Sequence, residues 1–93
     1  MDKFRLSDKA KEMPCGTIVY RIEALRDIPY WDVNKGDIGG FVEWEQNLSQ
    51  RENDYSWVGK DAVVMGRRTR IEGATKVTDD AIVQGDSHLS GSI

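Results

Sequence analysis

The sequence has little of what several protein classes depend on. It contains one cysteine, Cys15, one histidine and two prolines among 93 residues. A single cysteine excludes an internal disulfide and favours a reducing compartment. No apolar run approaches the roughly 20 residues that a membrane helix needs, and the N-terminal "MDKFRLSDKAKEM" lacks the apolar core of a signal peptide. We therefore expect a cytoplasmic protein with no membrane partner.

An excess of one charge sign is also missing. The formal net charge is −3, and 31% of the residues are charged. This balance gives no broad basic surface for nucleic acid, so nucleic acid is not an expected partner. A chain of this length buries only roughly 60–65% of its unfolded surface, which predicts one domain with a thin core.

Residues 56–93 repeat a six-residue unit. An aliphatic residue recurs every six positions, with one step of seven, at Val58, Val64, Ile71, Val77, Val83 and Leu89. A small residue stands two positions before each, and Gly or Asp stands two positions after five of them. The period-two spacing puts the small and aliphatic residues on one face of a short strand. Gly or Asp then supplies a turn.

This repetition predicts a mainly β fold, with a short left-handed parallel β-helix of about two coils over residues 56–93. Residues 1–55 are expected to form an irregular N-terminal β cap on it, within a single domain. An antiparallel meander is the alternative, although its turns usually fall at 8–12-residue spacing. The seven-residue step at Arg67-Arg68 is interpreted as a bulge at a corner.

The repeat predicts which strands pair and which side chains face outward. The predicted parallel pairs are 56–59 with 75–78, 62–65 with 81–84, and 69–72 with 87–90. Trp57 should point outward, and Val63, Met65 and Ile82 should form an outward apolar patch. Such a patch favours a contact surface. The alternative is that the N-terminal segment covers it.

The N-terminal half does not repeat. Residues 17–25 alternate apolar and polar side chains and predict a half-buried strand. Residues 27–41 are rich in turns and aromatics, residues 40–50 predict another strand, and residues 49–54 a polar loop. At the other end, Leu89 and Ile93 are candidate contacts between copies, because an open strand edge favours pairing with another chain. Homo-oligomerisation is therefore expected.

Several stretches together resemble one known family. They are "KFRLSD", "YRIEALRDI" (20–28), "VNKGDIGGFVE" (33–43), "NLSQ" (47–50) and the six-residue repeat. In these the chain resembles the YdcK-like family of bacterial and phage proteins. The resemblance implies a left-handed β-helix with a distinctive N-terminal segment. It carries over no catalytic residue, and the family members have many more repeats than this chain.

Candidate chemistry is sparse. Left-handed β-helices of the hexapeptide type are often acyltransferases with a histidine base, but His88 stands alone, with no Ser–His–Asp or Cys–His set. No metal-ligand spacing and no phosphate loop is present, so we expect no cofactor, no metal and no catalytic residue. Asp79 is interpreted as a turn former. The glycines of "GDIGG" (36–40) are expected to allow close backbone packing.

Two further groups are candidates for protein contacts. Arg67, Arg68 and Arg70 form the one basic cluster and could bind phosphate or a partner's carboxylates, or simply be solvated. Trp31 and Trp57 could be binding residues or packing anchors.

The sequence thus favours a non-enzymatic protein-interaction module. From the resemblance, its partner could be a host protein, including a defence protein inhibited by a phage-encoded chain. The alternatives are a self-assembling structural solenoid and an acyltransferase-like hexapeptide-repeat protein.

Overall fold

The computed structural model describes residues 2–51, 54–85 and 88–89, the last two by their backbone alone. The N-terminal half holds three longer strands, β1 (Phe4–Glu12), β2 (Ile18–Ala24) and β3 (Ile38–Val42), and two 3-10 helices, η1 (Pro29–Trp31) and η2 (Glu45–Asn47). Two-residue strands follow, namely β4 (Trp57–Val58), β5 (Val63–Val64), β6 (Arg70–Ile71), β7 (Lys76–Val77), β8 (Ile82–Val83) and β9 (His88–Leu89).

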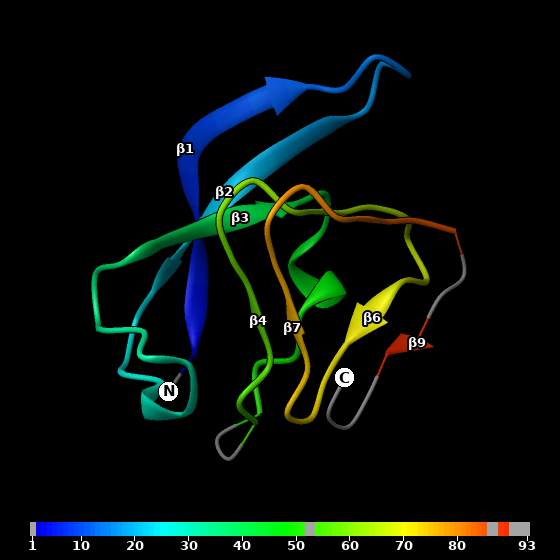
Figure 1. Ribbon diagram of the computed structural model, residues 1–93. Helices are drawn as coiled ribbons and strands as arrows, with labels where there is room; N and C mark the ends of the chain where they lie inside the picture. The colour runs from blue at the N-terminus through cyan, green and yellow to red at the C-terminus, as the bar shows by residue number, and fades with distance from the viewer. Residues whose placement is uncertain (1, 52–53, 86–87, 90–93) are drawn as a thin grey trace.

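The strands form one mixed sheet and two small parallel sheets. The five-stranded sheet has the order β1-β2-β3-β5-β8, with β1, β2 and β3 antiparallel and β3, β5 and β8 parallel. The other sheets pair β4 with β7 and β6 with β9 (Figure 1). The β1–β2 hairpin projects from the rest of the molecule at the top of Figure 1.

The predicted strand pairs and corners are confirmed. Trp57 is opposite Lys76, Val63 opposite Ile82 and Arg70 opposite His88, as the repeat predicts. The corner position of the repeat has positive φ at Gly66, Gly73, Asp79 and Gly85, with φ of 104°, 80°, 62° and 84°. Asp79 is therefore a turn residue, as expected. Lys60 occupies the same position with φ 51°, although neither Gly nor Asp marks it in the sequence.

The predicted fold class is wrong. The molecule is not a short left-handed parallel β-helix with an irregular cap, because its largest sheet is mixed and β1, β2 and β3 supply three of its five strands. The antiparallel meander is wrong for residues 57–89 too, because their strand pairs are parallel. The six-residue period determines which short strands pair. It carries no information on the longer antiparallel strands, which join the same sheet directly through β3 and β5.

The strand predictions in the N-terminal half are partly right. The strand predicted over 17–25 is confirmed as β2, but the strand predicted over 40–50 ends at Val42 and gives way to η2. The strand β1 was not expected. Its pairing with β2 shifts register between Leu6 and Ala10, so one regular alternation does not run along it.

Core residues pack on both faces of the mixed sheet. A larger cluster includes Ile22, Val42 and Val64, and a second cluster joins Val19, Phe41, Val63 and Met65. Four small residues of the repeat, Ser56, Ala62, Thr69 and Thr75, are buried as predicted, whereas the small residue Ala81 is exposed.

Two of the three glycines of "GDIGG", Gly39 and Gly40, allow close approach as expected, whereas Gly36 has open space around it and a positive φ of 94°. A Cβ on Gly39 would lie 2.5 Å from the carbonyl oxygen of Val58, and one on Gly40 would lie 2.6 Å from that of Ala62. Only glycine lets β3 pass this close to the backbone of β4 and of the segment between β4 and β5.

The N-terminal half covers outward positions of the repeat, and this corrects the predicted apolar patch. Val63 and Met65 are 2% and 6% exposed, because Val19, Phe41 and Met13 pack on them. Trp57, predicted to point outward, is 3% exposed and belongs to the larger cluster. Of the predicted patch, Ile82 alone is exposed, at 53%. The alternative that the N-terminal segment covers the patch therefore holds for Val63 and Met65.

Candidate functional site

A buried ion pair joins the start of the chain to the loop before β4. The Lys3 ammonium donates to Asp54 Oδ1 at 2.9 Å, to the Ser56 carbonyl at 2.7 Å and to Ser56 Oγ at 2.8 Å. Asp54 also accepts the backbone N–H of Ser56 at 2.8 Å and that of Gly73 at 2.7 Å. Burial lowers the pKa of Lys3 to about 8. Hydrogen bonds, from Ser56 first, outweigh burial and lower the pKa of Asp54 to about 2.

This cluster has the residue types of a Ser–Lys hydrolase site, but its geometry is structural. Lys3 and Ser56 are both 0% exposed. The three ammonium protons have three acceptors within the protein. In this protonated form the lysine nitrogen has no lone pair with which to act as a base. The Ser56 hydroxyl donates to Asp54 and accepts from Lys3, the reverse of the direction that a lysine base would need. A substrate could not reach this serine.

The "NLSQ" stretch also has a structural role. Asn47 is fully buried, and its Nδ2 donates to the carbonyls of Gly66 at 2.7 Å and Thr69 at 2.8 Å. Gln50 acts like a neighbouring strand: its Oε1 accepts the backbone N–H of Lys3 at 2.7 Å, and its Nε2 donates to the Phe4 carbonyl at 2.9 Å. These side chains join η2 to the corner before β6 and to β1.

An exposed aromatic cluster on the surface is formed by two residues of η1 and one of the loop before β4. Tyr30 and Tyr55 stack with ring centroids 5.7 Å apart, and the Trp31 ring meets Tyr30 edge-on at 4.6 Å. Tyr30 is 54% exposed and Tyr55 46% exposed. Trp31 Nε1 donates to the Tyr55 carbonyl at 2.7 Å, which fixes the indole against the loop. We call Tyr30, Trp31 and Tyr55 the aromatic cluster.

A groove of about 290 Å³ lies beside Trp31. Its lining includes Ile38, which is 44% exposed, and four charged residues, Asp32, Asp37, Lys60 and Lys76. The Lys76 ammonium lies 5.6 Å from the centre of the Trp31 ring, within cation–π range. The surface thus combines exposed aromatic and apolar area with charges of both signs.

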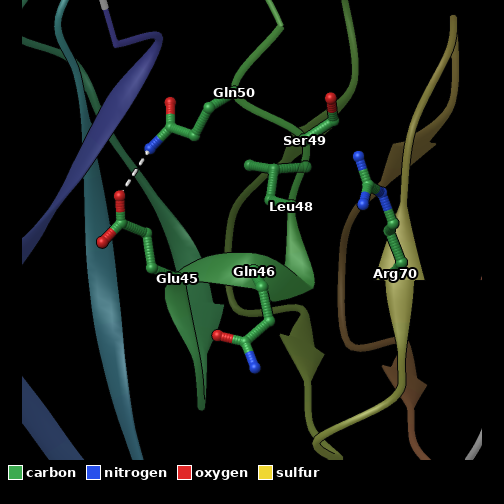
Figure 2. Close-up of a pocket in the computed structure, with 6 residues that line it drawn as sticks. All are labelled: Glu45, Gln46, Leu48, Ser49, Gln50 and Arg70. Carbon is green, nitrogen blue, oxygen red and sulfur yellow. Dashed lines mark hydrogen bonds between the residues drawn. The ribbon is translucent and has the colours of Figure 1, made fainter.

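Two adjacent cavities lie elsewhere on the molecule, between η2 and β6. The larger, of about 340 Å³, is lined by Glu45, Gln46, Leu48, Ser49, Gln50 and Arg70 (Figure 2). Gln50 donates to Glu45 at 3.3 Å across its wall. The smaller, of about 210 Å³, is lined by Gln46, Arg67, Arg68, Thr69 and Arg70. Arg70 and Gln46 line both.

The predicted contact residues do not form one site. Trp31 joins the aromatic cluster, and the three arginines gather at the smaller cavity. Trp57, Val63 and Met65 are buried and not available to a partner. Leu89 is described by its backbone alone, which pairs with Ile71, and Ile93 lies outside the described residues.

Sequence reasoning missed Tyr30 and Tyr55 as contact candidates. Tyr30 stands beside Pro29 and Trp31, and that aromatic run was the one local indication. Nothing in the sequence places Tyr55 against it, because the two tyrosines meet only through the folding of two loops.

Within residues 2–51, 54–85 and 88–89, no group of three His, Cys, Asp or Glu side chains could hold a metal ion. The described part of the chain has no helix long and apolar enough to cross a membrane. Neither the family models, nor the curated proteins, nor the solved structures contain a match to this chain.

Proposed function

We propose that this chain is a non-enzymatic protein-interaction module of the cytoplasm that binds a partner protein through the aromatic cluster. The observation that carries the proposal is the exposure of Tyr30 and Tyr55, about half of each side chain, in a fixed arrangement. Tyrosine and tryptophan are enriched at binding hot spots. They supply large contact area at little entropic cost, because few torsions must be fixed.

The surroundings of the aromatic cluster support this role. Ile38 adds exposed apolar area, and Asp32, Asp37, Lys60 and Lys76 surround the groove with polar groups. An apolar and aromatic centre with a polar rim is the usual composition of a specific protein interface. The hydrogen bond from Trp31 to the Tyr55 carbonyl holds the cluster in place before binding, which lowers the entropy lost on association.

A foreign protein suits this surface better than a small substrate. The Tyr30 and Tyr55 side chains lie outside the residues that line the groove, so they extend the surface rather than close a pocket. A host protein, including a defence protein, is the partner class that the family resemblance implies.

The test is a quantitative capture from lysate of the cells in which the chain is expressed, followed by reconstitution with the purified captured protein. The variant Tyr30→Ala/Tyr55→Ala removes both exposed rings and keeps the Trp31 bond to the backbone carbonyl. The control is Ile18→Ala, because Ile18 is also exposed, at 43%. We expect the wild type and the control to form a stoichiometric complex that the double variant loses. Equal retention by all three would contradict the proposal.

A second candidate is self-assembly, which Ile82 favours. In the described part of the chain, β7, β8 and β9 each lie at an edge of their sheet. Ile82 on β8 is 53% exposed there, and an edge with an exposed aliphatic side chain favours pairing between chains. Light scattering across a concentration range should then show an oligomer that Ile82→Lys converts to a monomer. A wild-type monomer at all concentrations would exclude this candidate.

A further inference from the structure

The smaller cavity beside β6 has an unusual lining. Of its five lining residues, Arg67, Arg68 and Arg70 carry a permanent positive charge, and Gln46 and Thr69 are neutral. No acidic side chain of the described residues lines it. We propose that this cavity is an oxyanion site that binds a phosphate group. The proposal is independent of the function proposed for the aromatic cluster, which lies on other elements.

The two walls of the cavity are held in a fixed relationship. One wall is η2, which carries Gln46, and the other is the corner 66–69 together with the start of β6, which carry the arginines. Asn47 joins them through its hydrogen bonds to the Gly66 and Thr69 carbonyls. The backbone N–H of Ser49 adds a bond to the Ile71 carbonyl at 2.9 Å. The Gly66 N–H donates to Glu43 Oε1 at 2.8 Å, so the corner is fixed from both sides.

Of the three arginines, Arg70 alone has an acidic partner among the described residues: its Nε forms an ion pair with Glu72 Oε2 at 3.5 Å, although this buried Nε donates no hydrogen bond. The Glu43 carboxylate also lies at the corner, where it accepts a backbone N–H. Glu45 lies in the neighbouring cavity, where it accepts a hydrogen bond from Gln50 (Figure 2). Like charges gathered on one short segment repel each other, and a bound anion would relieve that repulsion.

The dimensions and donors favour a phosphate group over larger anions. A cavity of about 210 Å³ equals roughly seven water volumes, at about 30 Å³ each. That is enough for one tetrahedral oxyanion with part of its hydration, and small for a whole drug-sized ligand. Guanidinium forks match phosphate oxygens in geometry, and Gln46 can add an amide donor. Duplex nucleic acid would need a basic surface that continues beyond this one cavity.

The test is a titration with inorganic phosphate at constant ionic strength, followed by NMR of the backbone amides of residues 66–70. We expect saturable shifts at these residues, with a Kd on the order of 1 mM for a site this exposed. Arg70→Gln should weaken binding roughly tenfold, because it removes a charge-assisted donor set. Gln46→Glu should abolish binding, because it puts a carboxylate into the cavity. Lys9→Gln is the control, since it removes one exposed positive charge elsewhere and should leave the Kd unchanged.

Two further probes identify the source of the phosphate. Glycerol 2-phosphate binding more tightly than inorganic phosphate would assign a phosphomonoester ligand, and equal binding would assign the free ion. Acetate shifting the same amides as strongly as phosphate would overturn the phosphate assignment in favour of general anion attraction. Shifts spread over the whole chain, or equal weakening in Arg70→Gln and Lys9→Gln, would overturn the site itself.

Discussion

Lys3 Nζ and Asp54 Oδ1 form an ion pair at 2.9 Å in which the side chains are 0% and 5% exposed. The pair joins the strand segment at the N-terminus to the loop before β4, across 51 residues of sequence. Lys3 has three acceptors, and Asp54 has the additional donors Ser56 and Gly73. Among the described residues Asp54 is the one anionic partner of Lys3, whereas Asp54 is also stabilised by backbone N–H donors, so loss of either partner should have a different cost.

This inequality predicts different costs for the two substitutions. Asp54→Asn leaves the Lys3 ammonium buried without its counter-charge and should lower the free energy of unfolding by about 3–5 kcal/mol. Lys3→Met removes the buried charge and leaves Asp54 with its N–H donors, so it should cost clearly less. Urea unfolding of both variants and of the double variant measures this. A larger cost for Lys3→Met than for Asp54→Asn would contradict the account.

The same pair predicts how stability varies with pH. The pKa of Asp54 is lowered to about 2 from 3.8, so its contribution is complete above pH 4 and is lost as the pH falls toward 2. The pKa of Lys3 is lowered to about 8 from 10.5, so the unfolded chain binds more protons between these values. The free energy of unfolding should therefore rise with pH from 8 to 10.5 relative to Lys3→Met. A constant difference between wild type and Lys3→Met over this range would refute this reading.

The close approach of β3 predicts opposite outcomes for two glycines. Gly39→Ala would put a Cβ 2.5 Å from a backbone oxygen and 2.8 Å from both Ile22 and Trp57, and should destabilise by more than about 2 kcal/mol. At Gly59 the nearest atom to an added Cβ is 3.4 Å away and φ is not positive. Gly59→Ala should thus be neutral or stabilise by up to about 1 kcal/mol. Thermal unfolding distinguishes them, and equal costs would be inconsistent with the packing.

The buried hydrogen bonds of Asn47 predict that a carboxylate at this position destabilises the protein. Asn47→Asp replaces an amide that donates to two carbonyls with a carboxylate that cannot donate, in a fully buried position. It should destabilise the protein by at least about 3 kcal/mol at neutral pH. Asn47→Ala removes both of these hydrogen bonds without burying a charge and should cost about 1–3 kcal/mol. Denaturant unfolding is the measurement, and a smaller loss for Asn47→Asp than for Asn47→Ala would argue against the hydrogen-bond assignment.

The sequence predicts the pairing of the short repeat strands correctly but not the overall fold. The six-residue period identifies the pairs Trp57–Lys76, Val63–Ile82 and Arg70–His88, because small, aliphatic and turn residues recur in register. It gives the wrong fold class, because the mixed sheet depends on pairings of β1, β2 and β3 that no repeat records.

The candidate site was predicted only in part, for a related reason. Alternation along a strand predicts that Val63 and Met65 are exposed. They are buried because Val19 and Phe41, which come from other strands, pack on them. The three arginines gather as their adjacency in sequence suggests. The stacking of Tyr30 on Tyr55 is a long-range contact between loops, which local patterns do not encode.

The most direct test of the proposed function is a calorimetric titration of the purified partner with the wild type, Tyr30→Ala/Tyr55→Ala and Ile18→Ala. Two hot-spot residues at about 1–2 kcal/mol or more each should weaken binding by at least roughly 30-fold in the double variant. Ile18→Ala should leave the Kd within about twofold, because it removes an exposed side chain outside the cluster. Equal affinities for the wild type and the double variant would show that the aromatic cluster is not the contact surface.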